Sequence, residues 1–306
     1  MQLWSAKTGK HIKTLTGDIF AISSDGKTVA GGFKNWQKPS SVNVWDTETG
    51  KLKQTFSINP KKGRELLVVS PDGKTLVSCH QAAGQIFEFW DVATGEHKLT
   101  LNTEPYYIRS VKFSPDSKTL VGLGEKDIPL WNANTSELMA TLKGHTSDAD
   151  FIVFSPDESI LASASSDETV RLWDTKTYEP KATLIGHTEI ITSIVFFPDG
   201  KTVATVSYVG VTRLWDTKTG KLKKTLPEHQ PIAFFPDGKT LVGITLNTIE
   251  FLDTKTWEPK LTLKGHSGKV DSVAFSPDGK TMARTGSTIL LWELTDLMTH
   301  LSKVIS

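Results

Sequence analysis

Hydrophobic and polar residues alternate along this chain in short runs that predict strands rather than helices. A first type of run, such as 191–197 (ITSIVFF), ends at a Pro-Asp-Gly turn. A second, such as 159–165 (SILASAS), and a third, such as 169–174 (TVRLWD), are rich in β-branched and aromatic residues and too short for helices. A fourth, such as 221–226 (KLKKTL), mixes lysine with leucine. That mixture suits an edge strand, because charge there prevents pairing with another sheet.

This set of four runs recurs along the whole chain. One marker is the aromatic or leucine position near the end of the third run, whose successive spacings range from 37 to 45 residues. Its members are Trp4, Trp45, Trp90, Trp131, Trp173, Trp215, Leu252 and Trp292. A second marker is the turn after the first run, which begins at Ser23, Ser70, Ser114, Ser155, Phe197, Phe235 and Ser276. The period predicts a repeat architecture of short antiparallel strands.

Two dipeptides occupy fixed places in this period. Gly-His stands at 144–145, 186–187 and 265–266, and Trp-Asp stands at 45–46, 90–91, 173–174 and 215–216. The chain thereby resembles the WD-repeat β-propeller family, whose unit carries Gly-His near its start and Trp-Asp near its end. The resemblance covers nearly the whole chain. It implies an all-β fold, a seven-bladed β-propeller with four-stranded antiparallel blades.

Counting the strands as a, b, c and d gives seven a-b-c sets, which we number as repeats one to seven. They lie at about 18–46, 64–91, 106–132, 149–174, 190–216, 231–253 and 270–293. Six of them have a following d strand. We expect the N-terminal run 11–16 to supply the seventh d strand, complete the last blade and close the ring, which removes exposed sheet edges.

The two ends of the chain add to this count. Residues 2–9 match a fragment of an eighth c strand and its c-d turn, which indicates either a segment of a longer chain or a ragged natural start. In the tail 294–306, leucines at helical spacing predict a short helix. We expect one propeller domain over 1–306.

Charge and composition exclude several classes of function. The 35 Lys and Arg balance 34 Asp and Glu to a net charge of +1, so no broad positive field favours nucleic acid or an acidic membrane. No apolar run approaches the roughly 18 residues of a membrane span, and the start lacks the layout of a signal peptide. The single cysteine, Cys79, fits a reducing compartment. We expect a cytoplasmic, monomeric propeller.

The repeat explains the histidines better than a metal site does. Four of them hold the same place in different repeats, namely His145, His187, His229 and His266. Residues separated around a ring do not converge to the roughly 2 Å that metal coordination requires. In the resembling family, this histidine joins a strand-b serine or threonine, a b-c-turn aspartate and the strand-c tryptophan in a hydrogen-bonded tetrad. Repeat four matches throughout with His145, Ser163, Asp167 and Trp173.

Other repeats depart from that tetrad, since Val209 in repeat five and Gly286 in repeat seven replace the aspartate. A His-Asp pair near a serine also has the residue types of a hydrolase. One repeat unit explains all four positions, so we assign them to the core. Cys79 is expected to pack within strand b rather than to react.

No catalytic or cofactor motif is found in the sequence. Five aspartates follow the period marker at turns, where hydrogen bonds to the turn backbone explain them without calcium: Asp46, Asp91, Asp174, Asp216 and Asp253. The chain has no Gly-rich phosphate loop, no Cys/His zinc spacing and no nucleophile elbow. We therefore predict no cofactor, no metal and no enzymatic activity.

Recognition is expected at one end of the strands. The a-b and c-d turns at the first end nearly repeat, whereas the d-a and b-c loops at the other end vary in length and chemistry. Variable loops on a rigid frame commonly carry binding. Candidate partner-binding residues, chosen for the chemistry of binding hot spots, are Trp36, Arg64, Tyr106, Tyr107, Tyr208 and Lys269. Trp36 lies outside the repeat frame and either anchors a partner or packs on its own blade.

We therefore predict a non-catalytic scaffold that holds a protein or peptide partner on its d-a/b-c loop face, a use that the resemblance implies. One alternative is a structural module of a larger multidomain or repeat protein, which the start within a repeat favours. A second alternative is an enzyme with a site in the axial cavity. It would need convergent titratable groups where the a strands offer mostly Ile, Val, Phe, Ser and Thr.

Overall fold

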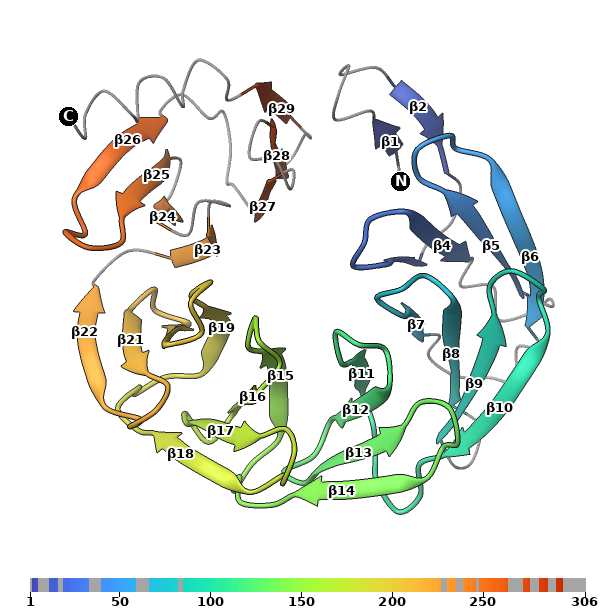
Figure 1. Ribbon diagram of the computed structural model, residues 1–306, viewed down its shortest axis with the longest axis horizontal. Coiled ribbons are helices and arrows are strands. Elements are labelled where there is room, and N and C mark those ends of the chain that lie inside the picture. Colours follow the sequence, from blue (N-terminus) through green and yellow to red (C-terminus); the bar gives the residue numbers. More distant parts are fainter. Residues whose placement is uncertain are drawn as a thin grey trace. The chain divides into compact units, whose positions relative to one another are not determined.

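The computed structural model describes residues 2–4, 11–15, 19–32, 40–58, 66–81, 85–226, 230–234, 239–245, 248–263, 272–275, 281–285 and 290–293. Every regular element within these ranges is a β-strand (Figure 1), which confirms the all-β prediction. The described part contains no helix that is long and apolar enough to span a membrane. The predicted tail helix over 294–306 lies outside it. The chain divides into two compact units, Met1–Ala149 and Asp150–Ser306.

The first unit contains the antiparallel hairpin β1–β2 and three four-stranded sheets, which are repeats one, two and three. Their strands are β1 (Gln2–Trp4), β2 (His11–Thr14), β3 (Ile19–Ile22), β4 (Thr28–Gly32), β5 (Ser40–Asp46), β6 (Leu52–Ile58), β7 (Leu66–Val69), β8 (Thr75–Gln81), β9 (Gln85–Asp91), β10 (His97–Asn102), β11 (Ser110–Phe113), β12 (Thr119–Leu123), β13 (Ile128–Asn132) and β14 (Leu138–Leu142).

The second unit contains the four-stranded sheets of repeats four, five and six and a sheet of three described strands in repeat seven. Their strands are β15 (Ala149–Phe154), β16 (Ile160–Ser165), β17 (Val170–Asp174), β18 (Pro180–Leu184), β19 (Ile191–Phe196), β20 (Thr202–Ser207), β21 (Thr212–Asp216), β22 (Leu222–Leu226), β23 (Gln230–Phe234), β24 (Thr240–Thr245), β25 (Thr248–Asp253), β26 (Pro259–Leu263), β27 (Ser272–Phe275), β28 (Thr281–Thr285) and β29 (Leu290–Glu293).

Within a sheet, burial follows strand order. The b strands β16 and β20 are buried at every position, because each has a hydrogen-bonded strand on both sides within its sheet. The d strands β18 and β22 are exposed or half-buried up to their last leucine. That gradient agrees with the mixed lysine and leucine pattern of the fourth run, which suits an edge strand.

The period marker also fixes a local irregularity. The register between strands c and d shifts at Trp45, Trp90, Trp131, Trp173, Trp215 and Leu252. In repeat four, Leu172 pairs with Ala182 while the next residue, Trp173, pairs with Pro180. A bulge of this kind increases the local twist of a strand pair. The same irregularity in six repeats shows that they share one backbone plan.

The hydrophobic core lies between consecutive sheets. In the second unit, one buried cluster joins Ile160, Ala162 and Leu172 of repeat four to Ile191 and Trp215 of repeat five. In the first unit, similar clusters join repeats one and two and repeats two and three. Each sheet therefore depends on its neighbour to bury its apolar face, as in other repeat proteins.

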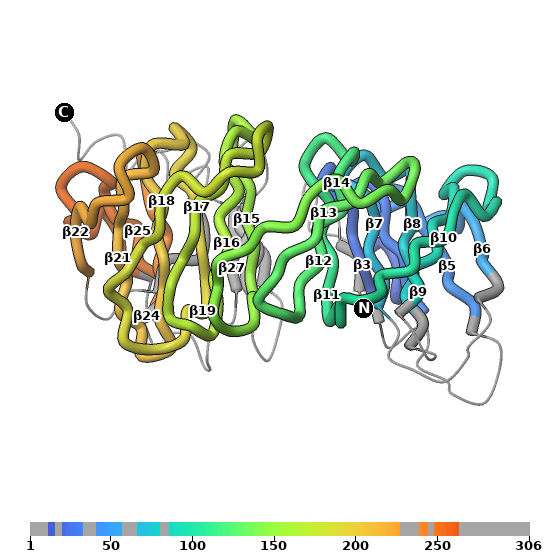
Figure 2. The backbone as a smooth tube through the Cα atoms, turned by 90° about the horizontal axis from the view of Figure 1, so that it is seen from below, coloured from blue at the N-terminus to red at the C-terminus, as the bar shows by residue number. Residues whose placement is uncertain are grey.

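The hairpin β1–β2 has the antiparallel pairing that a c-d hairpin requires, with Gln2 opposite Thr14. Pairing of the run 11–16 with repeat seven stays a prediction. Within repeats four and five, the antiparallel order of the strands places the a-b and c-d turns at one edge and the d-a and b-c loops at the other (Figure 2).

Candidate functional site

The a-b and c-d turns carry a hydrogen-bond framework that repeats from sheet to sheet. In repeat four, Asp174 Oδ1 accepts the backbone N–H groups of Lys176 and Thr177 at 2.9 and 3.0 Å. Its Oδ2 lies 3.3 Å from Nζ of Lys181 on β18. The N–H of Thr177, followed by that of Lys176, lowers the pKa of Asp174 to about 2. The lysine contact recurs as Lys53–Asp46, Lys98–Asp91, Lys223–Asp216 and Lys260–Asp253.

These aspartates hold turns, as the sequence indicates. Within the ranges that the structure describes, no three His, Cys, Asp or Glu side chains gather into a metal-binding group. Burial raises the pKa of the Cys79 thiol to about 12. The thiol therefore stays protonated and unreactive, in agreement with its expected packing role in strand b.

Repeat five contains a buried chain of hydrogen bonds that begins at a histidine. Trp215 Nε1 donates to Thr205 Oγ1 at 2.8 Å, and His187 Nε2 lies 2.6 Å from the same oxygen. Arg213 Nη1 lies 2.9 Å from His187 Nδ1. A guanidinium only donates, so Nδ1 is the acceptor and Nε2 carries the proton that is donated to Thr205.

The electrostatics agree with this neutral tautomer. Burial, and then the positive charge of Arg213, lower the pKa of His187 to about 4. His187 is therefore uncharged near neutral pH. The arginine contacts the nitrogen that faces away from Thr205, in a repeat where Val209 replaces the aspartate of the tetrad.

The predicted tetrad of repeat four is visible in part. Trp173 Nε1 donates to Ser163 Oγ at 2.8 Å. Asp167 Oδ1 accepts the N–H and the hydroxyl of Thr169 at 3.0 and 2.6 Å. His145 is buried, and its membership of the tetrad stays a prediction.

These hydroxyls are poorly placed for hydrolysis. Ser163 and Thr205 are both fully buried, so a substrate has no path to either oxygen in this conformation. A nucleophile must reach the atom that it attacks. The geometry around both hydroxyls supports packing rather than catalysis.

The six sequence-predicted partner residues differ in placement. Trp36, Arg64 and Lys269 lie outside the described residues. Tyr106 is half-buried, its hydroxyl lies 2.8 Å from Thr141 Oγ1, and its ring meets the Trp131 ring edge-on. Tyr106 therefore packs within repeat three. Tyr107, in the first unit, and Tyr208, in the second, are exposed by 53% and 75%.

Tyr208 belongs to an exposed apolar group at the loop end of repeat five, which we call the loop patch. The loop patch consists of Ile190 (49% exposed), Tyr208 and Val209 (60% exposed). The N–H of Tyr208 donates to the carbonyl of Ile190 at 2.8 Å and ties the b-c loop to the d-a loop. Ile185, at the start of the same d-a loop, is exposed by 73%. Contiguous exposed apolar side chains mark interaction surfaces more often than isolated ones do.

The loop patch arises where repeat five departs from repeat four. Alignment on the histidine and the tryptophan places Ile190, Tyr208 and Val209 at the positions of Asp148, Ser166 and Asp167. All three polar residues of repeat four make side-chain contacts of their own. Asp148 pairs with Arg109, Ser166 donates to Asp150, and Asp167 caps its turn.

Sequence reasoning selected Tyr208 but missed Ile190 and treated Val209 only as a lost aspartate. Alignment of repeats four and five identifies all three residues, because three polar positions of repeat four become apolar together in repeat five. Their proximity depends on the contact between two loops that are separate in the sequence.

Comparison with known proteins agrees with the repeat pattern. The model of the WD domain, G-beta repeat matches residues 136–174, 178–216 and 257–293. The anaphase-promoting complex subunit cdc20 of Dictyostelium discoideum is 28% identical over 172 residues, which are 53% of this chain and 34% of that protein. The nuclear distribution protein nudF of Emericella nidulans is 32% identical over 195 residues, 54% of this chain and 42% of that protein.

The matched segment therefore covers less than half the length of the cdc20 and nudF proteins. Apoptotic protease-activating factor 1 of Danio rerio is 32% identical over 142 residues, 43% of this chain and 10% of that protein. The Trp-Asp and Gly-His period, the antiparallel four-stranded sheets and these matches agree with one another. The chain therefore contains WD repeats, which the family model matches at 136–174, 178–216 and 257–293.

Proposed function

We propose that this chain is a seven-bladed propeller that serves as a non-catalytic, cytoplasmic platform for a protein or peptide partner. The partner binds the d-a/b-c loop face, and the loop patch of repeat five is its main anchor. One WD-repeat relative is named as a subunit of a complex, which supports a role in protein association. Neither a nucleic acid nor a membrane is part of the proposal, because the chain has a net charge of +1.

The seven-bladed ring rests on seven a-b-c sets in the sequence and on the run 11–16, which has the length and character of a d strand. In this proposal the run pairs with β29 and completes repeat seven. Removing residues 1–16 would then expose the edge of the last sheet and lower the melting temperature by more than 10 °C, since about 1 kcal/mol alone shifts a chain of this size by roughly 2–4 °C. A truncated chain that melts like the full chain would exclude closure by this run.

The observation that carries the binding proposal is the exposure of Tyr208 at 75% within an apolar group. Tyrosine offers a large apolar area with few rotatable bonds and a polar tip, so it is enriched at the energetic centres of interfaces. Its own backbone N–H is bonded to Ile190, which holds the loop in position before a partner arrives. Pre-ordered anchors lose less conformational entropy on binding.

The test compares proteins captured from native lysate by the wild-type chain and by the double variant Tyr208→Ser, Val209→Asp. The substitutions install the residues of repeat four at the same two positions, so the backbone already accommodates them in a neighbouring sheet. We expect the main partner to be recovered at least about tenfold less, as for loss of a hot-spot residue.

Leu138→Ser is the matched control. Leu138 is an exposed apolar residue on the edge strand β14, outside the loop patch. It should leave partner recovery unchanged. Equal recovery by the wild type and the double variant, with intact folding by circular dichroism, would rule out the loop patch as the anchor.

A further inference from the structure

Two departures from the repeat occur at the turn end of repeats five and six, opposite the loop patch. The first is Phe197, at a position where repeat six also carries phenylalanine, Phe235, and the five other repeats carry serine: Ser23, Ser70, Ser114, Ser155 and Ser276. In repeat four, Ser155 Oγ donates to Asp157 at 2.6 Å and accepts the N–H of Ile160 at 2.9 Å. The Phe197 side chain can make neither hydrogen bond, so the turn of repeat five lacks the side-chain hydrogen bonds that Ser155 makes in repeat four.

The second departure is Trp257, the last residue of the c-d turn of repeat six. The equivalent residues of repeats one, two and five are Gly50, Gly95 and Gly220, with φ between 66° and 80°. Trp257 adopts φ 67°, a left-handed conformation that is unfavourable for a bulky side chain. Ser136 and Tyr178 adopt the same conformation at this position of repeats three and four. The left-handed turn therefore belongs to the repeat, and the indole ring is what is particular to repeat six.

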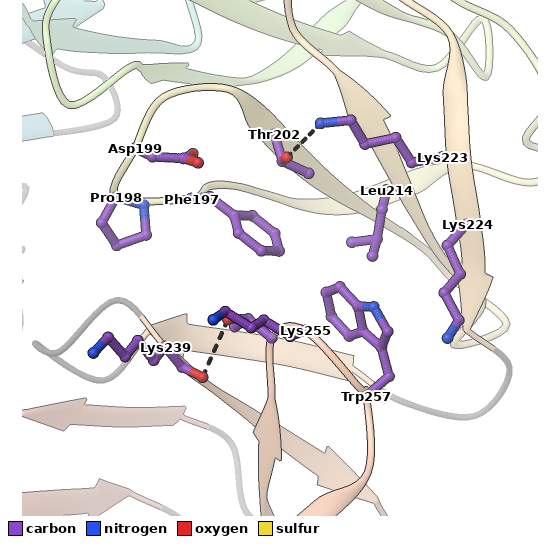
Figure 3. A pocket seen from close by; sticks show the side chains of 11 residues that line it. Phe197, Pro198, Asp199, Thr202, Leu214, Lys223, Lys224, Lys239, Lys255 and Trp257 are labelled. Atoms are coloured by element: carbon purple, nitrogen blue, oxygen red, sulfur yellow. Dashed lines mark hydrogen bonds between the residues drawn. The ribbon is translucent and has the colours of Figure 1, made fainter.

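The two departures meet. The ring centroids of Phe197 and Trp257 lie 6.0 Å apart at an interplanar angle of 60°. Together with Leu214 they form the apolar side of a pocket of about 470 Å³ between the turns of repeats five and six (Figure 3). That volume falls within the roughly 300–1,000 Å³ range of ligand sites.

Lysines surround this aromatic pair. Lys224 Nζ lies 5.6 Å from the centroid of the Trp257 ring, and Lys239 and Lys255 line the pocket with exposed side chains (Figure 3). Asp199 is the carboxylate of the lining. Lys223 has a structural role, since its Nζ bonds Thr202 and lies 3.2 Å from Asp216. The pocket therefore presents excess positive charge beside an apolar surface.

The equivalent place in repeats one and two lacks the aromatic pair. Gly95 stands at the position of Trp257, and Gln54 at that of Lys224. Gln54 Nε2 donates to the carbonyl of Thr94 at 2.8 Å, and a Cβ added at Gly95 would lie only 2.2 Å from that nitrogen. The notch between the turns of repeats one and two has a similar volume of about 590 Å³ and is also lined by lysines, namely Lys53, Lys74 and Lys98. The aromatic pair is therefore what distinguishes the notch of repeats five and six.

We propose that the pocket between Phe197 and Trp257 binds an acidic peptide segment with one aromatic or large aliphatic side chain. The apolar side chain packs on the half-buried Trp257 ring, which itself lies against the buried Phe197, and its flanking carboxylates meet Lys224, Lys239 and Lys255. Charge complementarity selects this occupant. A nucleic acid is disfavoured, because the chain as a whole has a net charge of only +1. This second site is independent of the loop patch.

The test is fluorescence polarisation with a labelled peptide that carries one phenylalanine among glutamates. We expect saturable binding that weakens as salt is raised. Trp257→Gly, which installs the residue that other repeats use at this φ, should weaken binding about tenfold, the loss typical of a hot-spot aromatic. Lys224→Gln, which installs the residue of repeat one, should weaken it about threefold. Replacing the peptide's phenylalanine by alanine should abolish the salt-resistant part of the binding.

Tyr178→Gly is the matched control, because Tyr178 occupies the same turn position in repeat four with φ 61°. This variant and the double variant Tyr208→Ser, Val209→Asp should bind the peptide as the wild type does. A benzophenone in place of the peptide's phenylalanine should cross-link to 197–202, 223–224 or 254–257.

Three results would overturn the proposal. They are the absence of saturable binding by the wild type, equal affinity of Trp257→Gly and wild type, and displacement of the peptide by an oligothymidylate at lower concentration than by unlabelled peptide. Any of these results would leave the proposed role of the loop patch unaffected, because partner capture through Tyr208 does not involve this pocket.

Discussion

Repeats four and five share a backbone plan but present different loops. Strand pairs β16–β17 and β20–β21 run in the same register, from Ile160 opposite Asp174 and from Thr202 opposite Asp216. Their b and c strands have matching burial patterns. The b-c loop of repeat four is polar and bonded to itself, whereas that of repeat five exposes Tyr208 and Val209. Strand packing thus constrains the frame and leaves loop chemistry free to diverge.

The same pair of repeats differs in the arginine beside the tryptophan. Arg213 of repeat five bonds His187. Arg171 of repeat four lies with its Cζ 6.0 Å from the centroid of the Trp173 ring, and its buried Nε has no hydrogen-bond partner among the residues that the structure describes. Both repeats therefore carry arginine at the same position. The neighbouring residues decide whether this arginine contacts the histidine or the tryptophan ring.

The largest expected effect tests what the two repeats share. Trp173→Ala and Trp215→Ala each remove a buried ring that donates to the strand-b hydroxyl. Each variant should lower the free energy of unfolding by about 3–5 kcal/mol through cavity formation. Urea denaturation followed by circular dichroism measures both. Losses that differ by more than about 2 kcal/mol between the repeats would contradict a common frame.

The next effect concerns pH and His187. Its pKa is near the ordinary histidine value of 6.5 when unfolded and about 4 when folded, so the unfolded chain binds the extra proton between these values. Its contribution to stability is therefore complete above about pH 6.5 and is lost as the pH falls toward 4, by up to about 3 kcal/mol.

Urea unfolding at several pH values measures that dependence. His187→Gln should reduce the slope of stability against pH in this window. Parallel profiles for the variant and the wild type would show that His187 does not carry the dependence.

A smaller effect sharpens the comparison of the b-c turns. Glu168 of repeat four has φ 66°, and Gly210 stands at the equivalent position of repeat five with φ 82°. Glu168→Gly relieves the left-handed strain but increases the entropy of the unfolded chain, so stability should rise by roughly 0.5 kcal/mol. Thermal unfolding by calorimetry measures the change. Destabilisation would indicate that the glutamate side chain makes a stabilising contact.

The smallest effect on stability is expected from Tyr208→Ser, Val209→Asp. Both side chains are mostly exposed, so the free energy of unfolding should change by less than about 0.5 kcal/mol. Denaturant midpoints measure this. A larger loss would show that the loop patch packs on its own repeat rather than awaiting a partner.

Local sequence was sufficient for the strands and turns of this protein. The runs around 159–165 and 169–174 have the composition and length of paired strands, and the structure places β16 and β17 there. The aspartates after the period marker bond the turn N–H groups two or three residues ahead. Interactions of such short range are encoded by neighbouring residues, so a single sequence reveals them.

The candidate sites depended on contacts between segments that are distant in sequence. Tyr106 and Tyr107 are adjacent aromatic residues, yet the first bonds Thr141 while the second is exposed. Phe197 and Trp257 lie in different repeats and meet only because the turns of repeats five and six are neighbours. The sequence by itself determined the repeat, its strands and its turns, because these follow from local spacing and hydrogen bonding. Tertiary structure alone decided which aromatic side chains pack and which remain exposed, because burial depends on what the neighbouring sheet brings to each residue.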